Sequence, residues 1–352
     1  MSLDAHVVTH RGDFAVDVAV QTDPGTTVAL LGPNGSGKTT TLDAIAGLLP
    51  LDGGHVRVSG VTWADAHTVL PPQRRRTGLV AANHLLFPHL TALENVAFGP
   101  RSRGLGRSAA RARARAELDA LGIGDLAGRR PTALSNGQAQ RTALARALAT
   151  DPAVLLLDEP LSALDPTTRA EVRAGLAHRL AGFAGVTVLV THDPLDALTL
   201  ADRLVFVEAG RVVQSGPPAE VVARPRDAYV AHVVGLNLYA GETRSQTLVE
   251  TSVGPVVTSG HDHVGPSWVS FAPAAVSLYP ARPGGSPRNA WECTVRAVEI
   301  VGQTARVRLT DDASGEPVVA EVTTASVAEL RLQTGATVWA TVKATEVTAY
   351  PA

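Results

Sequence analysis

A glycine-rich segment near the N-terminus contains the residue types that bind phosphate groups. It reads Gly32-Pro33-Asn34-Gly35-Ser36-Gly37-Lys38-Thr39, is followed by Thr40, and fits the spacing GxxxxGK[ST] in full. Glycines let successive backbone N–H groups turn toward phosphate oxygens, and the start of a following helix adds a favourable dipole. Lys38 can reach the β- and γ-phosphates, and the Thr39 hydroxyl can ligate Mg²⁺. A structural turn with an incidental lysine would not need this full match.

Two adjacent carboxylates, Asp158 and Glu159, follow the apolar run from Val154 to Leu157. A strand with a purely structural role would rarely end in two acids side by side. Asp158 is suited to hold Mg²⁺, and Glu159 is suited to polarise an attacking water as a general base. Taken alone, the pair could be a solvated strand end. Together with the phosphate-binding segment, it predicts hydrolysis of a nucleoside triphosphate.

A third segment of interest opens a predicted helix. It reads Leu134-Ser135-Asn136-Gly137-Gln138-Ala139-Gln140-Arg141. A serine-containing turn at the start of a helix is a second place where an anion can bind.

Short apolar runs must position these residues. They cover residues 27–31, 153–157 and 186–190, and each indicates a strand that is buried on both faces. Such strands are typical of parallel sheets covered by helices. An Ala/Arg-rich region, about 107–121, predicts a helical insert. The arginines at 101, 103, 107, 111, 113 and 115 could form a nucleic-acid surface, but a solvated helix face is the preferred interpretation.

The composition of the 352 residues sets limits on function. A formal net charge of −2 gives no general attraction to nucleic acid or anionic lipid. The one cysteine, Cys293, excludes an internal disulfide framework. The N-terminus lacks the pattern of a secretion signal, and no stretch reaches the roughly 20 apolar residues that span a bilayer. We therefore expect any membrane role to depend on a partner.

After about Leu236 the sequence changes to short Val/Thr-rich runs separated by Gly, Pro and Asp. Runs at 294–300, 305–309, 318–322 and 338–342 are candidate strands, which predicts a small all-β barrel. We expect one domain over 1–235, with a helical part at about 83–150, and a second over 236–352 with its core at 286–350. His261-Asp262-His263 is interpreted as a loop rather than a metal site.

Over residues 1 to about 235 the chain resembles the ATP-binding subunits of ABC transporters. The segment at 134–141 is similar to the family signature LSGGQxQR, with Asn136 at the first glycine position. Asparagine tolerates positive φ better than most residues, so we expect this departure to be mild. Ser162-Ala163-Leu164-Asp165 resembles the D-loop, and Thr191-His192-Asp193 resembles the switch region. Gly210 to Gly216 resembles the closing strands of the family.

This resemblance implies an α/β P-loop NTPase fold, an ABC ATPase with a helical insert, that uses ATP and Mg²⁺. It further implies a head-to-tail homodimer with two ATP molecules at its interface. The family's roles then fall on Glu159, His192 and Lys38 for catalysis and on Thr39 and Asp158 for the metal. The remaining nucleotide contacts implied beyond the phosphate loop are Ser135, Asn136, Gly137, Gln138 and Asp165.

The loop glutamine position departs from the family pattern, and the residue that stacks on adenine is left open. The loop glutamine that the family uses for Mg²⁺ and for coupling to the permease aligns with Ala82, and Asn83 lies one position late. We expect ATP binding to be retained, and this departure puts the metal geometry and the strength of coupling in question. His10 and Phe14 are candidates for stacking on adenine, although an ordinary core role for Phe14 is the preferred interpretation.

The C-terminal region resembles the Mop-type, TOBE-like module of molybdate importer ATPases. The resemblance rests on fragments between Ser286 and Val347, and it implies a barrel of OB/TOBE type. Residues suited to binding a tetrahedral oxyanion are Ser286, Arg288, Ser326, Lys343 and Thr345. These residues could equally serve only to stabilise the barrel and the dimer.

The combined resemblance implies the ATPase of an importer on the cytoplasmic face of the cell membrane, most simply for molybdate or tungstate. Its partners would be a separate permease and, indirectly, a substrate-binding protein, with no role for nucleic acid. Sulfate, iron or a polyamine are the alternative solutes. A soluble ABC ATPase that acts on DNA or ribosomes, and a molybdate storage or sensor protein, are the alternatives from other classes.

Overall fold

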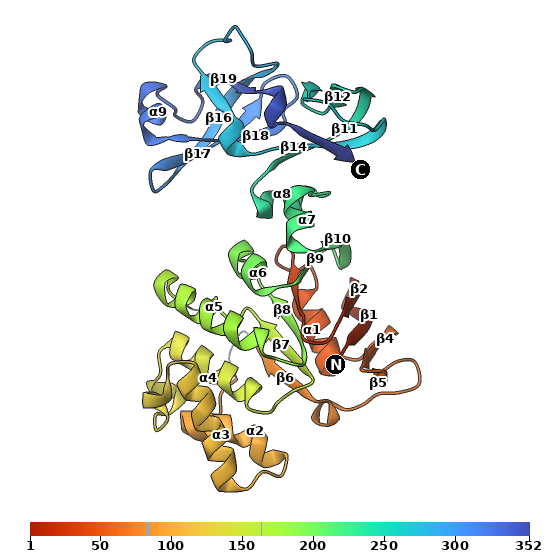
Figure 1. Ribbon diagram of the computed structural model, residues 1–352, viewed down its shortest axis with the longest axis vertical. Coiled ribbons are helices and arrows are strands. Elements are labelled where there is room, and N and C mark those ends of the chain that lie inside the picture. The colour runs from red at the N-terminus through yellow and green to blue at the C-terminus, as the bar shows by residue number, and fades with distance from the viewer. Residues whose placement is uncertain (82–84, 163) are drawn as a thin grey trace. The chain divides into compact units, whose positions relative to one another are not determined.

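The computed structural model describes residues 1–81, 85–162 and 164–352, and Figure 1 traces its elements. These residues form two compact units, Met1–Val221 and Val222–Ala352. The division falls within α7 (Pro218–Ala223), whereas the boundary expected at residue 235 follows the end of α8 (Ala228–Val234).

One large, mixed sheet organises the first unit. Its strands are β1 (Leu3–Arg11), β2 (Phe14–Thr22), β3 (Thr27–Leu31), β4 (Gly53–Val58), β5 (Val61–Ala64), β6 (Thr77–Val80), β7 (Val154–Asp158), β8 (Val186–Val190), β9 (Arg203–Glu208) and β10 (Arg211–Gly216). They lie in the order β5-β4-β1-β2-β10-β9-β3-β8-β7-β6. Neighbours from β9 to β6 pair in parallel, while β5, β4, β1 and β2 pair antiparallel. The predicted buried parallel strands are therefore confirmed.

Helices surround this sheet, and the predicted helical insert is also confirmed. The helices are α1 (Lys38–Ala46), α2 (Ala92–Ser102), α3 (Arg107–Ala120), α4 (Asn136–Leu148), α5 (Pro166–Ala181) and α6 (Pro194–Leu200), with short 3₁₀ turns at Pro72–Arg74, Gly124–Leu126 and Pro131–Ala133. In Figure 1, α2, α3 and α4 gather at one end of the unit, away from β1, β2, β4 and β5. None of the helices in the described residues has the length and apolarity needed to cross a membrane.

The arginines of the helical insert lie next to carboxylates. Arg111 contacts Glu94 at 2.5 Å, and Arg115 contacts Asp119 at 3.1 Å, one turn further along α3. The arginines of both pairs are exposed; such pairs contribute little stability but neutralise the charge of the helix face. They support the interpretation of this surface as a solvated helix face.

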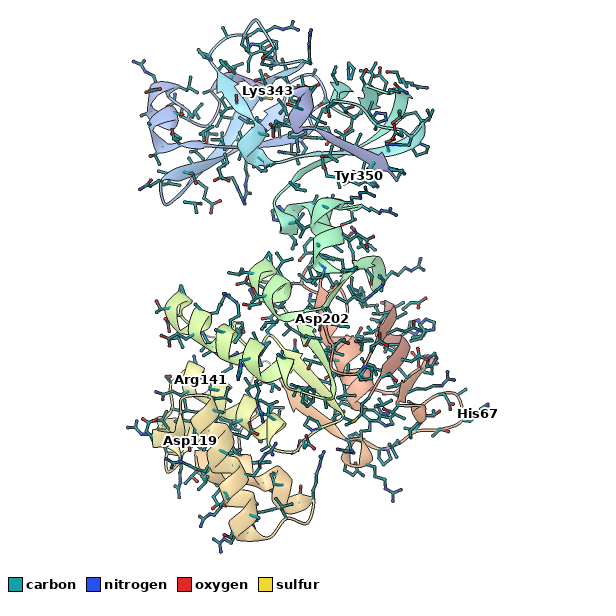
Figure 2. All side chains as sticks on the ribbon, in the orientation of Figure 1. His67, Asp119, Arg141, Asp202, Lys343 and Tyr350 are labelled. Carbon is teal, nitrogen blue, oxygen red and sulfur yellow. The ribbon has the colours of Figure 1, made fainter. Side chains whose placement is uncertain are left out.

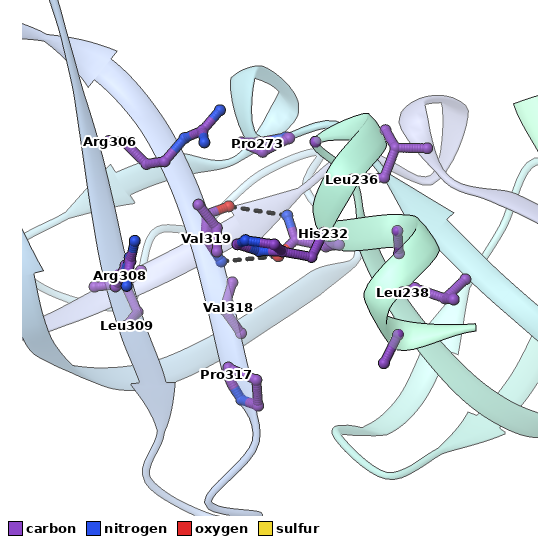
Figure 3. Close-up of a pocket in the computed structure, with 14 residues that line it drawn as sticks. His232, Leu236, Leu238, Pro273, Arg306, Arg308, Leu309, Pro317, Val318 and Val319 are labelled. Carbon is purple, nitrogen blue, oxygen red and sulfur yellow. Dashed lines mark hydrogen bonds between the residues drawn. The ribbon is translucent and has the colours of Figure 1, made fainter. Parts of the chain in front are cut away.

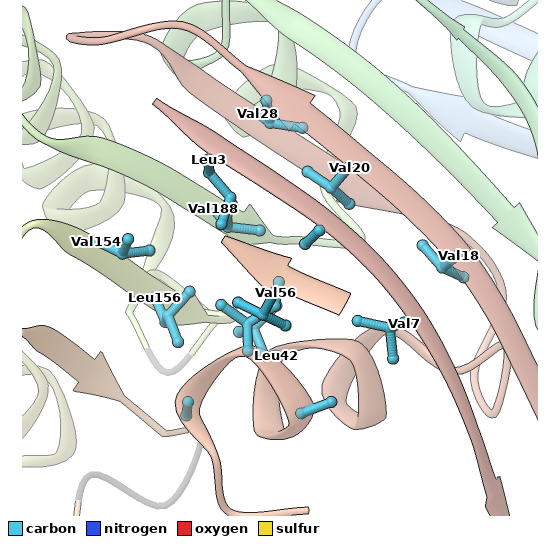
Figure 4. Close-up of a cluster of buried hydrophobic side chains, with 14 of the residues drawn as sticks. Leu3, Val7, Val18, Val20, Val28, Leu42, Val56, Val154, Leu156 and Val188 are labelled. Carbon is cyan, nitrogen blue, oxygen red and sulfur yellow. The ribbon is translucent and has the colours of Figure 1, made fainter. Parts of the chain in front are cut away.

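The core of the first unit lies between α1 and the sheet. Figure 4 shows Leu42 of α1 meeting side chains of the sheet such as Val56, Leu156 and Val188. These side chains are buried, and burial of each contributes about 1.5–3 kcal/mol relative to exposure. The phosphate-binding segment lies between β3 and α1, so this core fixes both of its ends.

A buried arginine that the sequence did not single out fixes the other end of α1. Arg75 is 4% exposed, and its Nη1 donates to the carbonyl oxygens of Ala44 and Ile45 at 3.0 and 2.7 Å. These carbonyls belong to the last turn of α1, where helical i+4 partners run out, and Ala44 O also accepts from the N–H of Gly47 at 3.1 Å. Gly47 has φ of 81°, which favours glycine, and a Cβ there would lie 2.6 Å from Arg75 Cζ and displace the guanidinium.

The second unit is built almost entirely from strands, as expected. Its elements are α8 (Ala228–Val234), β11 (Asn237–Ser245), β12 (Leu248–Thr251), β13 (Gly254–Val257), β14 (Gly265–Phe271), β15 (Ser277–Tyr279), β16 (Asn289–Val301), β17 (Thr304–Asp311), β18 (Pro317–Thr323), α9 (Thr324–Glu329), β19 (Thr337–Val342) and β20 (Thr348–Pro351), with 3₁₀ turns at Pro273–Ala275 and Ala344–Glu346. They form two sheets, β15-β19-β16-β17-β18 and β13-β12-β11-β14-β20. The four candidate strands all lie in the first sheet, and the second sheet was not predicted.

The two sheets share one core. Phe271 of β14 and Trp291 of β16 stack with ring centroids 5.9 Å apart, and Tyr239 OH donates to Pro317 O at 2.7 Å. Asn237 links the start of β11 to β18 by exchanging two hydrogen bonds with the backbone of Val319, at 2.9 and 2.8 Å, and dashed lines mark them at Val319 in Figure 3. A cavity of about 290 Å³ beside this pair contains no residue predicted to be functional.

Candidate functional site

The phosphate-binding segment forms a tight turn around the ammonium group of Lys38. Lys38 Nζ donates to Gly32 O at 2.9 Å and to Pro33 O at 2.8 Å, and burial lowers the pKa of this lysine. Only glycine fits at position 32, because a Cβ there would lie 2.0 Å from Val207 O. The turn therefore places a buried cation at the start of α1, where the helix dipole also favours an anion.

Two oxygen donors suited to Mg²⁺ face each other beside this turn. Thr39 Oγ1 donates to Asp158 Oδ2 at 3.1 Å, which joins the first residues of α1 to the end of β7. Asp158 is 8% exposed, and its burial raises the pKa of the carboxyl group. Mg²⁺ is usually held by one or two carboxylates together with phosphate oxygens and water, so this donor pair fits the ion.

Glu159 and His192 come together next to the same turn. His192 Nδ1 lies 3.1 Å from Glu159 Oε1, although the two residues follow different strands, β7 and β8. The backbone of Glu159 has φ of 49°, a left-handed conformation that costs a residue with a Cβ about 1–2 kcal/mol. Its N–H donates to Val190 O at 2.9 Å. The strand ends thus fix the acid and the histidine in one place.

A cavity of about 460 Å³ brings much of the predicted site together. Its lining consists of Arg11, Phe14, Asn34, Gly35, Ser36, Gly37, Lys38, Thr39, Thr40, Glu159 and Val190. Phe14 therefore borders the cavity as well as the core, which supports it as the aromatic contact for a base. His10 does not border it, because its ring is held by Asp52 at 2.9 Å. Sequence reasoning missed Arg11; its only signal is a basic residue at the turn between β1 and β2.

The serine-containing segment forms the predicted helix start, but away from this cavity. Ser135 caps α4: its Oγ accepts from Gln138 N at 3.3 Å, and its own N–H donates to Gln138 Oε1 at 3.1 Å. We expected asparagine at position 136 to be tolerated because it accepts positive φ, and this reason was wrong. Asn136 is the first residue of α4 in right-handed helical conformation, so it does not use its tolerance of positive φ. A Cβ at Gly137 would lie 2.5 Å from Leu164 Cδ2.

Asp165 and the switch region serve as helix caps. Asp165 accepts from Thr168 N at 3.1 Å at the start of α5, and its hydrogen bonds with Thr168 lower the pKa of its carboxyl group. Asp193 caps α6 and accepts from Arg169 Nη1 at 2.9 Å. These contacts fix the residue that follows His192 and the last residue of the D-loop-like segment. Ala82 and Asn83 fall outside the described residues, so the prediction about this loop stays a prediction.

The five oxyanion candidates divide between two places in the second unit. Asn289 of β16 pairs with Val342 of β19, so Arg288 and Lys343 flank the same pair at one end of the two strands. Figure 2 labels the exposed Lys343 there, and Thr345 follows in the next 3₁₀ turn. Ser286 lies in the loop before β16.

Ser326 is the fifth candidate and belongs to α9. Its Oγ lies 2.9 Å from Thr323 Oγ1, the cap of that helix. It borders a cavity of about 460 Å³ that it shares with residues of β15 and β18. The other four candidates do not border this cavity.

The buried carboxylate of Asp158 yields a prediction about stability. Because its folded-state pKa is raised above the ordinary 3.8, stability should fall as the pH rises from about that value through the raised pKa. We expect Asp158→Asn, which still accepts from Thr39, to unfold at a temperature equal to or above that of the wild type near neutral pH and to lose Mg²⁺-dependent ATP hydrolysis. Thermal unfolding of both proteins without nucleotide, at acid and at neutral pH, checks this. A midpoint for Asp158→Asn below that of the wild type at neutral pH would contradict the prediction.

Two protein families match parts of this chain. A family described as ABC transporter matches residues 16–162, and a TOBE domain matches residues 285–349. The molybdenum import ATP-binding protein ModC of Mycobacterium tuberculosis is 42% identical over 97% of this chain and 95% of its own length. The Fe(3+) ions import ATP-binding protein FbpC of Streptomyces avermitilis is 40% identical over 88% of this chain and 87% of its own.

A solved structure also matches part of the chain. The ATP-binding cassette MJ0796, in a dimeric post-hydrolysis state bound to ADP and Pi, superimposes with a TM-score of 0.55 and 28% identity. The match covers 61% of this chain and 98% of the cassette. Because a relative more than 30% identical spans nearly the whole sequence, the chain belongs to the ABC transporter family, as an ABC-type ATPase that carries a C-terminal TOBE domain.

Proposed function

We propose that this chain energises the import of an oxyanion, molybdate or tungstate, by hydrolysing ATP beneath a separate membrane permease. The observation that carries the proposal is the likeness to the molybdenum import protein ModC, which continues through both units of the chain. The first unit supplies a phosphate turn and two carboxylates for hydrolysis, and the second supplies a TOBE domain. A storage or sensor protein would have no use for the hydrolytic residues.

The residues of the first unit can divide the chemistry among themselves. Lys38 and the N–H groups of its turn bind the β- and γ-phosphates, and Phe14 stacks on the adenine. Thr39 and Asp158 would hold Mg²⁺, which neutralises phosphate charge as the terminal phosphoryl group leaves. Glu159 accepts a proton from the attacking water, and His192, 3.1 Å from the Glu159 carboxylate, orients that water and contacts the γ-phosphate.

A second copy of the chain completes the site. In the described residues, the helix start at Ser135 does not border the cavity lined by Lys38. An antiparallel, head-to-tail pair of chains would let Ser135, Asn136, Gly137 and Gln138 cover the γ-phosphate bound by the partner, with Asp165 beside it. MJ0796 forms a dimer in its own structure, which supports this arrangement.

ATP would then act as the bridge that closes the dimer. Moving a two-state balance from 1:99 to 99:1 needs about 5.5 kcal/mol, which charge-assisted phosphate contacts from both copies can supply. Hydrolysis removes the bridging phosphate and lets the dimer reopen. We propose that the permease follows this motion through the surface near Leu86 to Asn95, at the cytoplasmic face of the membrane. A substrate-binding protein would deliver the solute to the permease.

The solute is the part of the proposal that an experiment must separate from iron, because FbpC proteins are also similar to this chain. The permease that co-purifies with the full chain should be reconstituted with it in liposomes. We expect molybdate and tungstate, and neither sulfate nor ferric iron, to enter in an ATP-dependent manner. Uptake of iron alone would replace the proposed solute and leave the ATPase assignment intact. The same complex with Arg288→Ala and Lys343→Ala tests whether the TOBE domain senses the oxyanion through these residues.

A further inference from the structure

Gln140 connects the helix that begins at Ser135 to the catalytic segment of the same chain. It lies three residues after Gly137, so both project from one face of α4. That face packs on the segment after β7: a Cβ at Gly137 would touch Leu164, and Gln140 Nε2 donates to Glu159 O at 3.1 Å. Gln140 is 2% exposed, which makes this a buried hydrogen bond.

The carbonyl that Gln140 bonds belongs to a strained residue. Glu159 is in the left-handed region with φ of 49°, and such a conformation persists only when several contacts enforce it. The contacts are few and well defined. Ser162 donates to the same carbonyl from its N at 3.2 Å and from its Oγ at 2.9 Å, and Glu159 N donates to Val190 O at 2.9 Å. Gln140 is the contact among these that comes from α4.

The glutamine is not explained by stability. In the described part of the chain, Gln140 Oε1 is buried without a hydrogen-bond partner. The amide cannot turn around to relieve this, because a carbonyl oxygen only accepts and Nε2 must face Glu159. A buried acceptor without a partner is costly, whereas an apolar side chain of the same shape would avoid that cost. The hydrogen bond to Glu159 O is therefore the contact of this amide that an apolar side chain of the same shape would remove.

We propose that Gln140 is a positioning residue for hydrolysis. It holds the main chain of Glu159 so that the carboxylate points at the attacking water beside His192. Because the same helix begins at Ser135, Gln140 also couples the ATP that this helix contacts across the dimer to the chain's own Glu159. This coupling rests on the proposed function of the dimer, while the positioning of Glu159 needs only the contacts within one chain.

Gln140→Met tests the positioning in the full-length chain. We expect kcat for ATP hydrolysis to fall by about 10- to 100-fold, because misplacing a catalytic group by about 1 Å has effects of this size. KM for ATP should stay unchanged, and the midpoint of thermal unfolding should stay equal or rise. Gln303→Met, in the exposed turn between β16 and β17, is the matched control and should leave all three values unchanged.

Gln140→Glu adds a readout that a purely structural role would not change. A protonated carboxyl group can donate to Glu159 O and an ionised one cannot, and burial raises the pKa of a carboxyl group. We expect kcat relative to the wild type to be highest at acid pH and to fall as the pH rises.

Several outcomes would overturn this inference. They are a Gln140→Met variant with wild-type kcat, a loss of kcat accompanied by a lower unfolding midpoint, or a Gln140→Glu variant whose relative kcat does not change with pH. A wild-type chain that hydrolyses no ATP would instead overturn the proposed function. The two failures are therefore distinguishable in one set of assays.

Discussion

Replacing Glu159 by glutamine is expected to lower the rate of ATP hydrolysis by about 10²- to 10⁴-fold, the usual contribution of a general base. Glutamine keeps the size of the side chain and a carbonyl oxygen that can face His192, now 3.1 Å from the carboxylate, but it cannot accept the proton of the attacking water. Single-turnover release of phosphate measures the effect directly. Binding of ATP should persist, because Lys38 and the phosphate turn are unchanged.

Glu159→Gln should also accumulate as the closed dimer when ATP is bound. If ATP bridges two copies and is hydrolysed too slowly to leave, Glu159→Gln should be dimeric with saturating Mg-ATP and monomeric without nucleotide. Light scattering coupled to gel filtration distinguishes the two. Glu171→Gln, an exposed position on α5, is the matched control and should hydrolyse ATP like the wild type. A Glu159→Gln variant that stays monomeric with Mg-ATP would contradict the composite site.

The sequence predicts best those strands whose residues are apolar on both faces, because such a strand shows as one unbroken apolar run. The strand β3 is buried along its whole length, and its unbroken run of apolar residues indicates a central parallel strand. The strand β1 alternates instead, with Leu3, Ala5 and Val7 buried between partly exposed neighbours. That period of two was available in the sequence, because the polar Asp4 and His6 fall between the apolar residues, but the strand was not predicted.

Contacts made by a single polar side chain at long range were beyond prediction. Arg75 lies about thirty residues from the carbonyl oxygens of Ala44 and Ile45, and a buried arginine in a sequence looks like any surface arginine. The second sheet of the TOBE-containing unit was missed for a related reason. Its strands β12 and β13 have four residues each, too short to show a period, and β20 joins them from the far end of the chain.

The candidate site was more predictable than the fold, because its residues are fixed by spacing. The structure brings together three of the segments that the sequence singled out: Thr39 contacts Asp158, and His192 contacts Glu159. The sequence could not show what holds these segments together. The hydrogen bond from Gln140 to the main chain of Glu159 depends on a backbone conformation at Glu159 that no residue type in the segment requires.

Lys38→Met is expected to weaken ATP binding by about 10- to 100-fold, since a hydrogen bond to a charged group contributes about 1.5–3 kcal/mol. Hydrolysis should fall further, because negative charge on the phosphates grows as the terminal group leaves. Titration of a fluorescent ATP analogue into the full chain measures the binding. Arg57→Met, which removes an exposed positive charge from β4, is the matched control and should bind ATP like the wild type.

The same substitution separates function from stability. Burial lowers the pKa of Lys38 from its ordinary 10.5, so the folded chain binds fewer protons than the unfolded chain between the two values. The stability of the wild type should therefore rise with pH across that window, and Lys38→Met should lack this rise while unfolding at an equal or higher temperature near neutral pH. A variant that binds ATP poorly because it is unfolded would instead have a lower unfolding temperature than the wild type. The turn thus holds a charge that costs stability until a phosphate neutralises it.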